Sequence, residues 1–551
     1  MKLSNIFTTA SAAALLLSGS SMLSGCTDNF GTLNTNQYEV NPDNMPFAAQ
    51  FIEPMTYVYA PHQNMFQFWT NLSIDLFGGY FMTPHNFGGN GNVDYKLNRG
   101  FCGGMYENYY LHIFNNTSRL IKACDAKGVT DFAAVMRVVQ AYATACATDA
   151  YGPIAYKSVI ESNGVTYAYD SQEEIYNEIF KLLDEAIAGF KNGKSTPEQM
   201  QGFDYWCNGD KALWIKVANQ FKLRYAMRIV KANPTLAKQK AEEAVRGGVL
   251  TSTDRDILID HGISNELTRM FEWGDCGINA NLTTIMAGLK DPRIDLYITK
   301  NKDDVKVKDA TVVAKGTQYL GIRGGCSLPN KPNAWTNYSQ AVCSYATPLP
   351  VMKVAEAYFL RAEGALRGWA MGADAQQLYE EGIRVSIQNE LKYKKAYANI
   401  ESISEEEINK YINGTSKQLD YVDPADSQNN IKAMNDVSVK WDANASKEEK
   451  LQRIIIQKWI ANFPLSTEAW ADYRRTGYPK LFPNRVNSSD GTIDTDEQIR
   501  RLIYNNVEIN TNNAELQKGI ELLNKENSSS KFKGDIGGTR VWWDKQGAAN
   551  F

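Results

Sequence analysis

The chain has 551 residues, a formal net charge of −4 and a high aromatic content of 29 Tyr, 22 Phe and 11 Trp. This length can bury a large core in one domain or in two or three smaller ones. The slightly acidic balance argues against a nucleic-acid-binding protein, which needs a basic surface. Beyond the N-terminus, no stretch approaches the length of a membrane span.

The N-terminus has the pattern of an exported lipoprotein. An apolar run over residues 10–17 follows a start whose only charged side chain is Lys2. It is too short to cross a bilayer and is typical of a secretory signal. The following Leu23-Ser24-Gly25-Cys26 matches a bacterial lipobox. We therefore expect a signal peptide over 1–25, lipid on the thiol of Cys26, and a polar tether over 26–45. An ordinary cleaved signal beside a coincidental cysteine is the alternative.

Long helical patterns dominate the remainder. Ser171 is an expected N-cap, and Glu174 three residues later completes a capping box. Pro234 begins another helix that ends at Gly247-Gly248. Apolar and small residues recur at three- and four-residue spacing over 131–148, from 171 to 187, and over 211–231, 354–366, 374–385 and 447–473. These stretches predict an all-α protein.

The helices predict a scaffold over about 111–250, 350–390 and 447–480, within a single domain spanning 46–551. Helix pairs with small residues at their contacts resemble tetratricopeptide-like units, although the consensus repeat is not clean. The stretches of about 61–110 and 251–348 lack this periodicity and are rich in Gly, Asn and aromatic residues. Irregular segments of this length are often functional, so we expect them to form a loop-rich ligand-binding lobe.

Five strings, in this order behind a lipobox, resemble the SusD/RagB family of Bacteroidetes outer-membrane lipoproteins. They are Thr148-Asp149-Ala150-Tyr151-Gly152-Pro153-Ile154-Ala155-Tyr156, Tyr169-Asp170-Ser171-Gln172-Glu173-Glu174-Ile175-Tyr176, Trp214-Ile215-Lys216-Val217-Ala218-Asn219-Gln220-Phe221-Lys222-Leu223-Arg224-Tyr225, Ala355-Glu356-Ala357-Tyr358-Phe359-Leu360-Arg361-Ala362-Glu363 and Glu468-Ala469-Trp470-Ala471-Asp472-Tyr473-Arg474-Arg475-Thr476-Gly477-Tyr478-Pro479. The resemblance covers essentially the whole mature chain.

The resemblance implies a lipid-anchored, surface-exposed outer-membrane protein without catalytic activity. Such proteins capture glycans, or sometimes peptides, and deliver them to a SusC-like TonB-dependent transporter. The implied fold is a scaffold of tetratricopeptide-like helix pairs with an irregular ligand-binding lobe. Peptide cargo, a surface glycoside hydrolase and a structural adaptor remain as alternatives. The family has no single portable ligand motif, and the acidic export signal after the cysteine is represented only by Asp28.

Patterns of enzymes and metal sites are weak. The four histidines, His62, His85, His112 and His261, lack the spacing of a zinc site, and no Gly-x-Ser-x-Gly elbow is present. Residues 189–195 imitate a phosphate loop but follow a helix, so we interpret them as a helix end. Asp490, Asp494 and Asp496 form an acidic loop in which a structural calcium ion is possible but not indicated. No cofactor is expected.

Three features are expected to serve the fold. Glu356 and Glu363 are seven residues apart on one helix and so share a face, where structural hydrogen bonding is the expected role. Arg474 and Arg475 can bridge carboxylates and carbonyls between helices. Besides Cys26 there are seven cysteines, and we expect one or two disulfides at most and buried free thiols at most of these positions.

A sugar ligand needs flat aromatic faces for its C–H surface and forked polar side chains for its hydroxyls. The irregular segments supply this mixture at Trp69, Asp75, Tyr80, His85 and Asn86, at Trp273, Asp275, Asn279 and Asn281, and at Tyr319, Arg323, Asn333, Trp335, Asn337 and Tyr338. The predicted ligand-binding residues are Trp69, Tyr80, Trp273, Asn281, Arg323, Trp335 and Tyr338. Binding residues concentrate on loops that a rigid scaffold positions.

Overall fold

A computed structural model describes residues 46–89, 91–161, 166–398 and 400–551. The predicted signal peptide over 1–25, the tether over 26–45 and the lipid attachment residue Cys26 lie outside the described residues. Residues Phe51–Phe551 form one compact unit, to which the following description applies.

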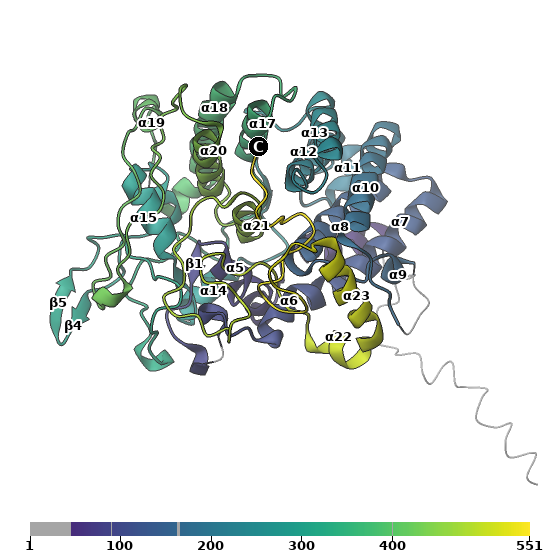
Figure 1. The fold of residues 1–551 in the computed structure, drawn as a ribbon. Coiled ribbons are helices and arrows are strands. Elements are labelled where there is room, and N and C mark those ends of the chain that lie inside the picture. Colours follow the sequence, from purple (N-terminus) through teal and green to yellow (C-terminus); the bar gives the residue numbers. More distant parts are fainter. Residues whose placement is uncertain (1–45, 90, 162–165, 399) are drawn as a thin grey trace, which may run out of the picture. The chain divides into compact units, whose positions relative to one another are not determined.

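The first part of the scaffold consists of long helices that pack in succession (Figure 1). They are α7 (Asn115–Lys127), α8 (Thr130–Tyr151), α10 (Gln172–Asn192), α12 (Lys211–Arg228) and α13 (Pro234–Gly247). α8 packs between α7 and α10, and α12 packs between α10 and α13. The predicted all-α class and the helix-pair scaffold are therefore confirmed.

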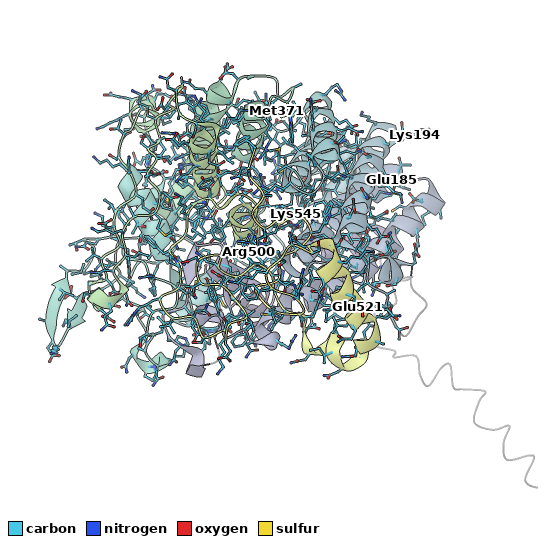
Figure 2. The ribbon with its side chains drawn as sticks, viewed as in Figure 1. Glu185, Lys194, Met371, Arg500, Glu521 and Lys545 are labelled. Atoms are coloured by element: carbon cyan, nitrogen blue, oxygen red, sulfur yellow. The ribbon has the colours of Figure 1, made fainter. Side chains whose placement is uncertain are left out.

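Local sequence signals set the ends of these helices. The Ser171 hydroxyl accepts a hydrogen bond from the Glu174 N–H, and the Glu174 carboxylate accepts one from the Ser171 N–H, which is the predicted capping box. α10 ends at Asn192, and Gly193 follows as its cap, so residues 189–195 form a helix end. At the solvent edge, Arg137 of α8 forms an ion pair with Glu185 of α10 (Figure 2).

The second part of the scaffold comprises α17 (Val354–Leu366), α18 (Ala375–Ala398), α20 (Lys447–Ala461) and α21 (Ser466–Thr476). α17 packs against α18, α20 and α12, which joins the two parts. The sequence predicted one helical stretch over 447–473, but the structure divides it between α20 and α21. Pro464 lies in the connection, and proline cannot donate the backbone hydrogen bond that an uninterrupted helix would need there.

The irregular segments hold short elements. Their helices are α3 (Ile52–Thr56), α4 (Gln63–Phe66), the π-helical turn η3 (Gln67–Asn71), α5 (Ile74–Phe77), α6 (Arg99–Tyr109), α14 (Leu267–Glu272), α15 (Ala280–Leu289), α16 (Ile294–Tyr297) and the 3-10 turn η7 (Lys331–Asn333). The remaining helices are α9 (Lys157–Ile160), α11 (Pro197–Gln201), α19 (Glu405–Ile412), α22 (Asn506–Thr511) and α23 (Asn513–Glu526). Sequence periodicity missed α6, α15 and α23.

Short antiparallel strand pairs fasten the irregular segments. β1 (Phe81–Met82) pairs with β3 (Gly277–Ile278), and β2 (Ile257–Ile259) pairs with β6 (Leu349–Met352). β4 (Val305–Val307) and β5 (Ala310–Val313) form a hairpin. The β1–β3 pair joins the segment over 61–110 to the segment over 251–348, so the two irregular stretches meet although almost two hundred residues separate them.

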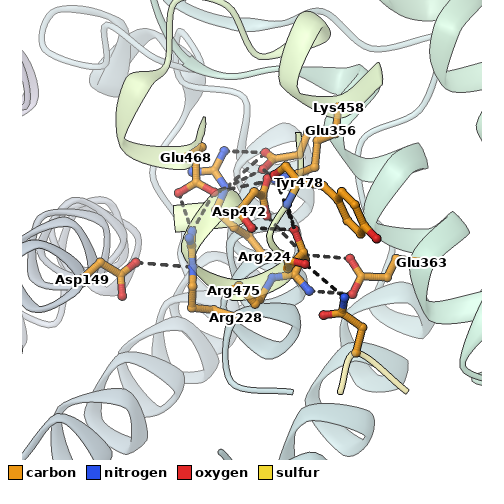
Figure 3. Close-up of polar contacts among 12 residues, drawn as sticks. Asp149, Arg224, Arg228, Glu356, Glu363, Lys458, Glu468, Asp472, Arg475 and Tyr478 are labelled. Carbon is orange, nitrogen blue, oxygen red and sulfur yellow. Dashed lines mark hydrogen bonds and ion pairs between the residues drawn. The ribbon is translucent and has the colours of Figure 1, made fainter. Parts of the chain in front are cut away.

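A buried ion network connects five helices at the centre of the scaffold (Figure 3). Arg224 of α12 donates to both oxygens of Glu356 on α17, the shortest contact being 2.5 Å. Lys458 of α20 lies 3.1 Å from Glu356 and 2.5 Å from Asp472 of α21. The guanidinium of Arg475 donates to both oxygens of Glu363, at 2.6 and 2.8 Å. These side chains are almost entirely buried.

The same network reaches α8. Arg228 of α12 donates to both oxygens of Glu468 on α21, at 2.8 and 2.7 Å, and its Nε lies 3.4 Å from Asp149. Arg474 bonds the carbonyl oxygens of Asp149 and Arg500, at 2.6 and 2.9 Å. The predicted structural roles of Glu356 and Glu363, and of Arg474 and Arg475, are therefore confirmed.

Mutual pairing keeps Asp472, Glu356 and Glu363 ionised. Burial alone would raise the pKa of Asp472, but the adjacent Lys458 and Arg475 lower it to about 2. Burial likewise opposes ionisation of Glu356 and Glu363, and the neighbouring cations nevertheless lower both pKa values. Each charge therefore depends on its partners, because an unpaired ion in this interior would be strongly unfavourable.

All seven cysteines among the described residues are free thiols, and six of them are buried, as expected for most of these positions. None of the described helices combines the length and the apolar character needed to cross a membrane.

Glu356→Gln tests the network, because it keeps the side-chain volume and removes one charge. Arg224 and Lys458 would then lack their shared partner, and we expect a loss of about 3–5 kcal/mol in the free energy of unfolding. Urea titration followed by tryptophan fluorescence measures this. The matched control is Glu521→Gln on the exposed surface of α23 (Figure 2), where the same chemical change should have little effect. Equal stability of the two variants would contradict the role of the network.

Candidate functional site

Asp275 joins four loop segments in the lobe. Gln67 Nε2 donates to Asp275 Oδ2 at 2.9 Å, and His85 Nε2 lies 2.8 Å from Oδ1. Lys331 Nζ reaches the same Oδ1 at 2.6 Å. The four residues come from η3, from the loop after β1, from the loop after α14 and from η7. One carboxylate thus fastens parts of the chain that are remote in sequence.

The hydrogen bonds around His85 fix its tautomer. The backbone N–H of Phe87 donates to Nδ1 of His85 at 3.1 Å, so Nδ1 is an acceptor. The ring proton therefore lies on Nε2, where it is donated to Asp275. This arrangement orients both the ring of His85 and the chain that leads to Phe87.

The surroundings of Asp275 favour its ionised form. Asp275 is 5% exposed and His85 is 2% exposed, whereas the Lys331 side chain is 56% exposed and reaches in from solvent. Burial would raise the pKa of Asp275, but the hydrogen bonds from His85, Lys331 and Gln67 lower it below its usual value. Asp275 is therefore a carboxylate at neutral pH, and its role is to accept hydrogen bonds.

Backbone hydrogen bonds align two of the loops side by side. The N–H of Asn86 donates to the carbonyl of Pro329, and the N–H of Trp335 donates to the carbonyl of Pro84, both at 3.0 Å. The Asn86 amide also donates to Asn330 Oδ1 at 3.1 Å. The loop after β1 and the loop around η7 therefore form one continuous surface.

This surface carries partly exposed aromatic rings. Trp273 and Trp335 are both half-buried. The loops that carry them touch, since a Cβ atom added to Gly274 would lie only 3.0 Å from Cγ2 of Thr336. Gly274 has a φ of +68°, which favours glycine. The ring of Trp335 stacks on the buried Tyr338 with centroids 5.8 Å apart, which holds it in place.

A second group of rings adjoins the first through His85. Phe87 stacks on His85 with centroids 4.1 Å apart and meets the edge of Phe101. Phe101 in turn stacks on Phe68 with centroids 5.5 Å apart. Phe68, Phe87 and Phe101 are half-buried; Phe68 and Phe87 follow Gln67 and His85 closely in sequence, and Phe101 lies in α6. The loops that Asp275 connects therefore present aromatic rings beside the amides of Asn86 and Asn330.

The predicted ligand-binding residues differ in how far their side chains are exposed to solvent. Trp273 and Trp335 are half-buried on loops that touch, whereas the other five are buried: Trp69, Tyr80, Asn281, Arg323 and Tyr338. The Tyr80 hydroxyl bonds the Trp459 carbonyl of the scaffold. Asn281 accepts the Phe482 N–H, and Arg323 donates to the carbonyls of Pro483 and Asn429. Of these seven residues, only Trp273 and Trp335 are partly exposed to solvent, and Tyr338 packs against Trp335.

Other residues of the irregular segments serve the fold. Asp75 is buried, accepts the Thr70 hydroxyl, and has its pKa raised by burial to about 6. Asn279 caps α15 and donates to the Phe81 carbonyl. Tyr319 bonds Asp295, and Asn337 bonds the carbonyl of Asp304. These contacts position the loops, but none of these residues belongs to the group around Asp275.

Sequence reasoning missed Gln67, Lys331 and the three phenylalanines of this site. Lysine is common on protein surfaces and phenylalanine is common in cores, so neither residue type by itself indicates a binding site. The one available hint was the proximity of Phe68, Phe87 and Phe101 to polar residues within the irregular segment over 61–110. In the described part of the chain, no group of three or more His, Cys, Asp or Glu side chains is arranged to hold a metal ion. Asp494 instead pairs with Lys531.

Comparisons with known proteins agree with this architecture. The family model described as SusD-like, SusD and RagB outer membrane lipoprotein, matches residues 28–544. A chitin-binding SusD homologue from Flavobacterium johnsoniae is 34% identical, with a TM-score of 0.81 over 92% of this chain and 100% of that chain. A SusD homologue from Bacteroides uniformis is 31% identical, with a TM-score of 0.79 over 91% of this chain and 99% of that chain. No curated protein matches the sequence.

Asp275→Asn tests whether this carboxylate fastens the loops. We expect the variant to be less stable than wild type by about 1–3 kcal/mol at pH 7, because the charge-assisted hydrogen bonds from Lys331 and His85 are lost or weakened. Urea titrations from pH 7 down to pH 3.5 measure the difference.

The pH dependence follows from the lowered pKa of Asp275. The stabilisation by Asp275 is fully present above the pKa of an unfolded aspartate, about 3.9. It is lost as the pH falls from there through the folded pKa. The difference between wild type and variant should therefore be constant from pH 7 to about 5 and shrink below about 4. A difference that grows as the pH falls would contradict the assignment.

Proposed function

The chain belongs to the SusD-like family of outer membrane lipoproteins, and from this premise we propose that it captures glycans at the surface around Asp275. In this proposal the protein binds its ligand without altering it and delivers it to a SusC-like TonB-dependent transporter. Lipid on Cys26 anchors it at the cell surface.

The observation that carries the proposal is the pair of tryptophans on loops fastened by Asp275. Trp273 and Trp335 are half-buried on touching loops, and each therefore has part of its ring free for contact. An aromatic face can pack on the C–H face of a sugar ring, while neighbouring amides bond its hydroxyls. Asn86 and Asn330 supply such amides next to the Trp335 loop.

The solved relatives support the choice of ligand class. The Flavobacterium johnsoniae homologue, 34% identical over 92% of this chain, is described as chitin-binding. Chitin oligosaccharides are therefore the first ligands to test. A peptide is the second candidate, because polar and aromatic loops also bind extended peptides.

The state of Asp275 favours binding over glycoside hydrolysis. A hydrolase needs a carboxylic acid with a raised pKa that can protonate the leaving oxygen, opposite a second carboxylate. Asp275 is the carboxylate at the centre of the loop group, and its neighbours lower its pKa. Incubation with chitin and other polysaccharides followed by product analysis tests this. Released oligosaccharides would establish an enzyme.

Trp273→Ala and Trp335→Ala test the glycan surface. We expect each substitution to weaken chitin-oligosaccharide binding by on the order of tenfold or more, as for central aromatic residues of other binding surfaces. Isothermal titration calorimetry on the soluble chain after Cys26 measures this, with peptides as the second ligand panel. Circular dichroism checks that the variants fold.

The matched control is Trp441→Ala. Trp441 is also half-buried, but it packs on Tyr379 of α18 in the scaffold. We expect it to leave glycan affinity unchanged. Unchanged affinity in both Trp273→Ala and Trp335→Ala, with normal folding, would remove this surface from the proposal. Binding of peptides alone would favour the second candidate ligand.

The anchor and the partner are tested in the native membrane. We expect Cys26→Ala to shift the protein from the membrane fraction to the soluble fraction, because the lipid attachment site is lost. We also expect the wild-type protein, purified from detergent-solubilised outer membranes, to bring a TonB-dependent transporter with it. If the variant stays in the membrane fraction as wild type does, the proposed lipid anchor is wrong. If the protein is purified without any transporter, the proposed partner is wrong.

A further inference from the structure

Two adjoining cavities lie beside the turn that follows α12, away from the loops around Asp275. Their volumes are about 870 and 540 Å³, and they share Lys231 and residues 548–550 as a common wall. We call the smaller one the Lys231 cavity. Its other walls are the end of α21 at residues 473–477, parts of the segment 496–500, and residues from 540 to 550. Its volume is in the range of small-molecule sites.

Basic side chains dominate the lining of the Lys231 cavity. They are Lys231, Arg474, Arg475, Lys480, Arg500, Arg540 and Lys545, and the acids on its wall are Glu448, Asp496 and Glu497. Figure 2 labels Arg500 and Lys545, which lie beside α21 in that view. The four arginines are all buried, so solvent screens their charges less than those of surface residues.

Three of the arginines are already compensated. Arg475 pairs with Glu363, and Arg500 and Arg540 both pair with Asp544 at 2.6 Å. Among the acids on the wall, Glu497 pairs with Arg540 at 3.0 Å. These pairs largely cancel the charges of the three guanidinium groups.

Arg474 is held without a carboxylate partner. Its guanidinium lies between the rings of Trp470 and Trp543, with centroids 3.6 and 4.7 Å away. Its hydrogen bonds go to backbone carbonyls, and within the described residues no carboxylate lies at ion-pair distance from it. The charge of this buried arginine is therefore only partly balanced.

Lys231 is the second uncompensated cation. Across residues 46–89, 91–161, 166–398 and 400–551, no hydrogen bond or ion pair involves its ammonium group. Burial, together with repulsion from Arg475 and Arg367, lowers the pKa of Lys231 to about 8. Lys480 also lacks a carboxylate partner in the described chain, and Lys545 bonds only the Glu526 carbonyl. The cavity thus holds more positive charge than its own acids balance.

We propose that the Lys231 cavity is a second binding site, which takes a saccharide-sized molecule through a carboxylate or sulfate group placed against Lys231 and Arg474. The larger neighbouring cavity is less suited, because its Lys238, Arg246 and Lys447 are exposed and solvated. The proposal does not depend on the glycan surface around Asp275, because the two sites share no residue.

Calorimetry with three probes tests the proposal: glucuronate, glucose as its neutral counterpart, and sodium sulfate. We expect glucuronate to bind and glucose not to bind. If sulfate binds as tightly as glucuronate, the site is one for free inorganic anions, and the proposal that it takes a saccharide is wrong. Absence of binding by both anions would overturn the whole proposal.

Lys231→Met should weaken glucuronate binding at least tenfold, and Lys480→Met provides a second, exposed variant that should weaken it less. The matched control is Lys238→Met, which removes a solvated lysine of the neighbouring cavity and should leave binding unchanged. In anion-free buffer, Lys231→Met should unfold at a temperature no lower than wild type, because it removes a half-buried charge that has no ion-pair partner in the described chain. In wild type, glucuronate should raise the unfolding temperature, and the substitution should abolish that rise.

A lower unfolding temperature of Lys231→Met in anion-free buffer would indicate a structural lysine and overturn the proposal, as would unchanged glucuronate affinity. Trp273→Ala and Trp335→Ala should bind glucuronate normally, and Lys231→Met should bind chitin oligosaccharides as wild type does. If the experiments contradict one of the two sites, the test of the other site is therefore unaffected.

Discussion

The buried ion network between α8, α12, α17, α20 and α21 is the constraint on which the remainder of the structure depends. Burying charges is costly unless each one has a well-placed partner. Glu356 can be ionised in the core only if Arg224 and Lys458 arrive from two other helices at the same point. The network therefore specifies which helices are neighbours and in what register they pack. Apolar contacts alone would restrict the packing less strictly.

The scaffold fixed in this way positions the lobe. The indole N–H of Trp459 on α20 donates to the Gly78 carbonyl at 2.9 Å, and the Tyr80 hydroxyl bonds the Trp459 carbonyl in return. β1 begins directly after these contacts and pairs with β3. Asp275 lies just before β3, so the helices fix the position of the loops around Asp275 through a few residues.

The two candidate sites use different chemistry. Around Asp275 the charges are paired with one another, and what faces outward is aromatic and amide surface suited to a neutral ring with hydroxyl groups. In the Lys231 cavity the arrangement is reversed, because Lys231 and Arg474 are left without carboxylates. A protein that carries both surfaces could distinguish neutral from acidic saccharides by where they bind.

Sequence patterns alone were enough to predict the long scaffold helices and the family. Caps and periodic apolar spacing are local signals, and they placed α8, α10, α13 and α17 within a few residues of their observed ends. The strings that carried the family resemblance contain Asp149, Arg224, Glu356, Glu363, Glu468, Asp472 and Arg475, which meet in the buried network. Structural roles were predicted for Glu356 and Glu363, which share a helix face, and for Arg475. The roles of Asp149, Arg224, Glu468 and Asp472 in the network became evident only from the fold.

Which loop residues form the surface that we propose for glycans depends on the tertiary fold. Gln67 and Asp275 are 208 residues apart, and no periodic or capping signal links them. Composition drew attention to both irregular segments and to two rings that are partly exposed, Trp273 and Trp335. It could not separate these from Trp69 and Tyr80, which have the same chemistry and lie in the core. The exposure of a side chain cannot be known from its residue type, because it depends on how segments distant in sequence pack against it.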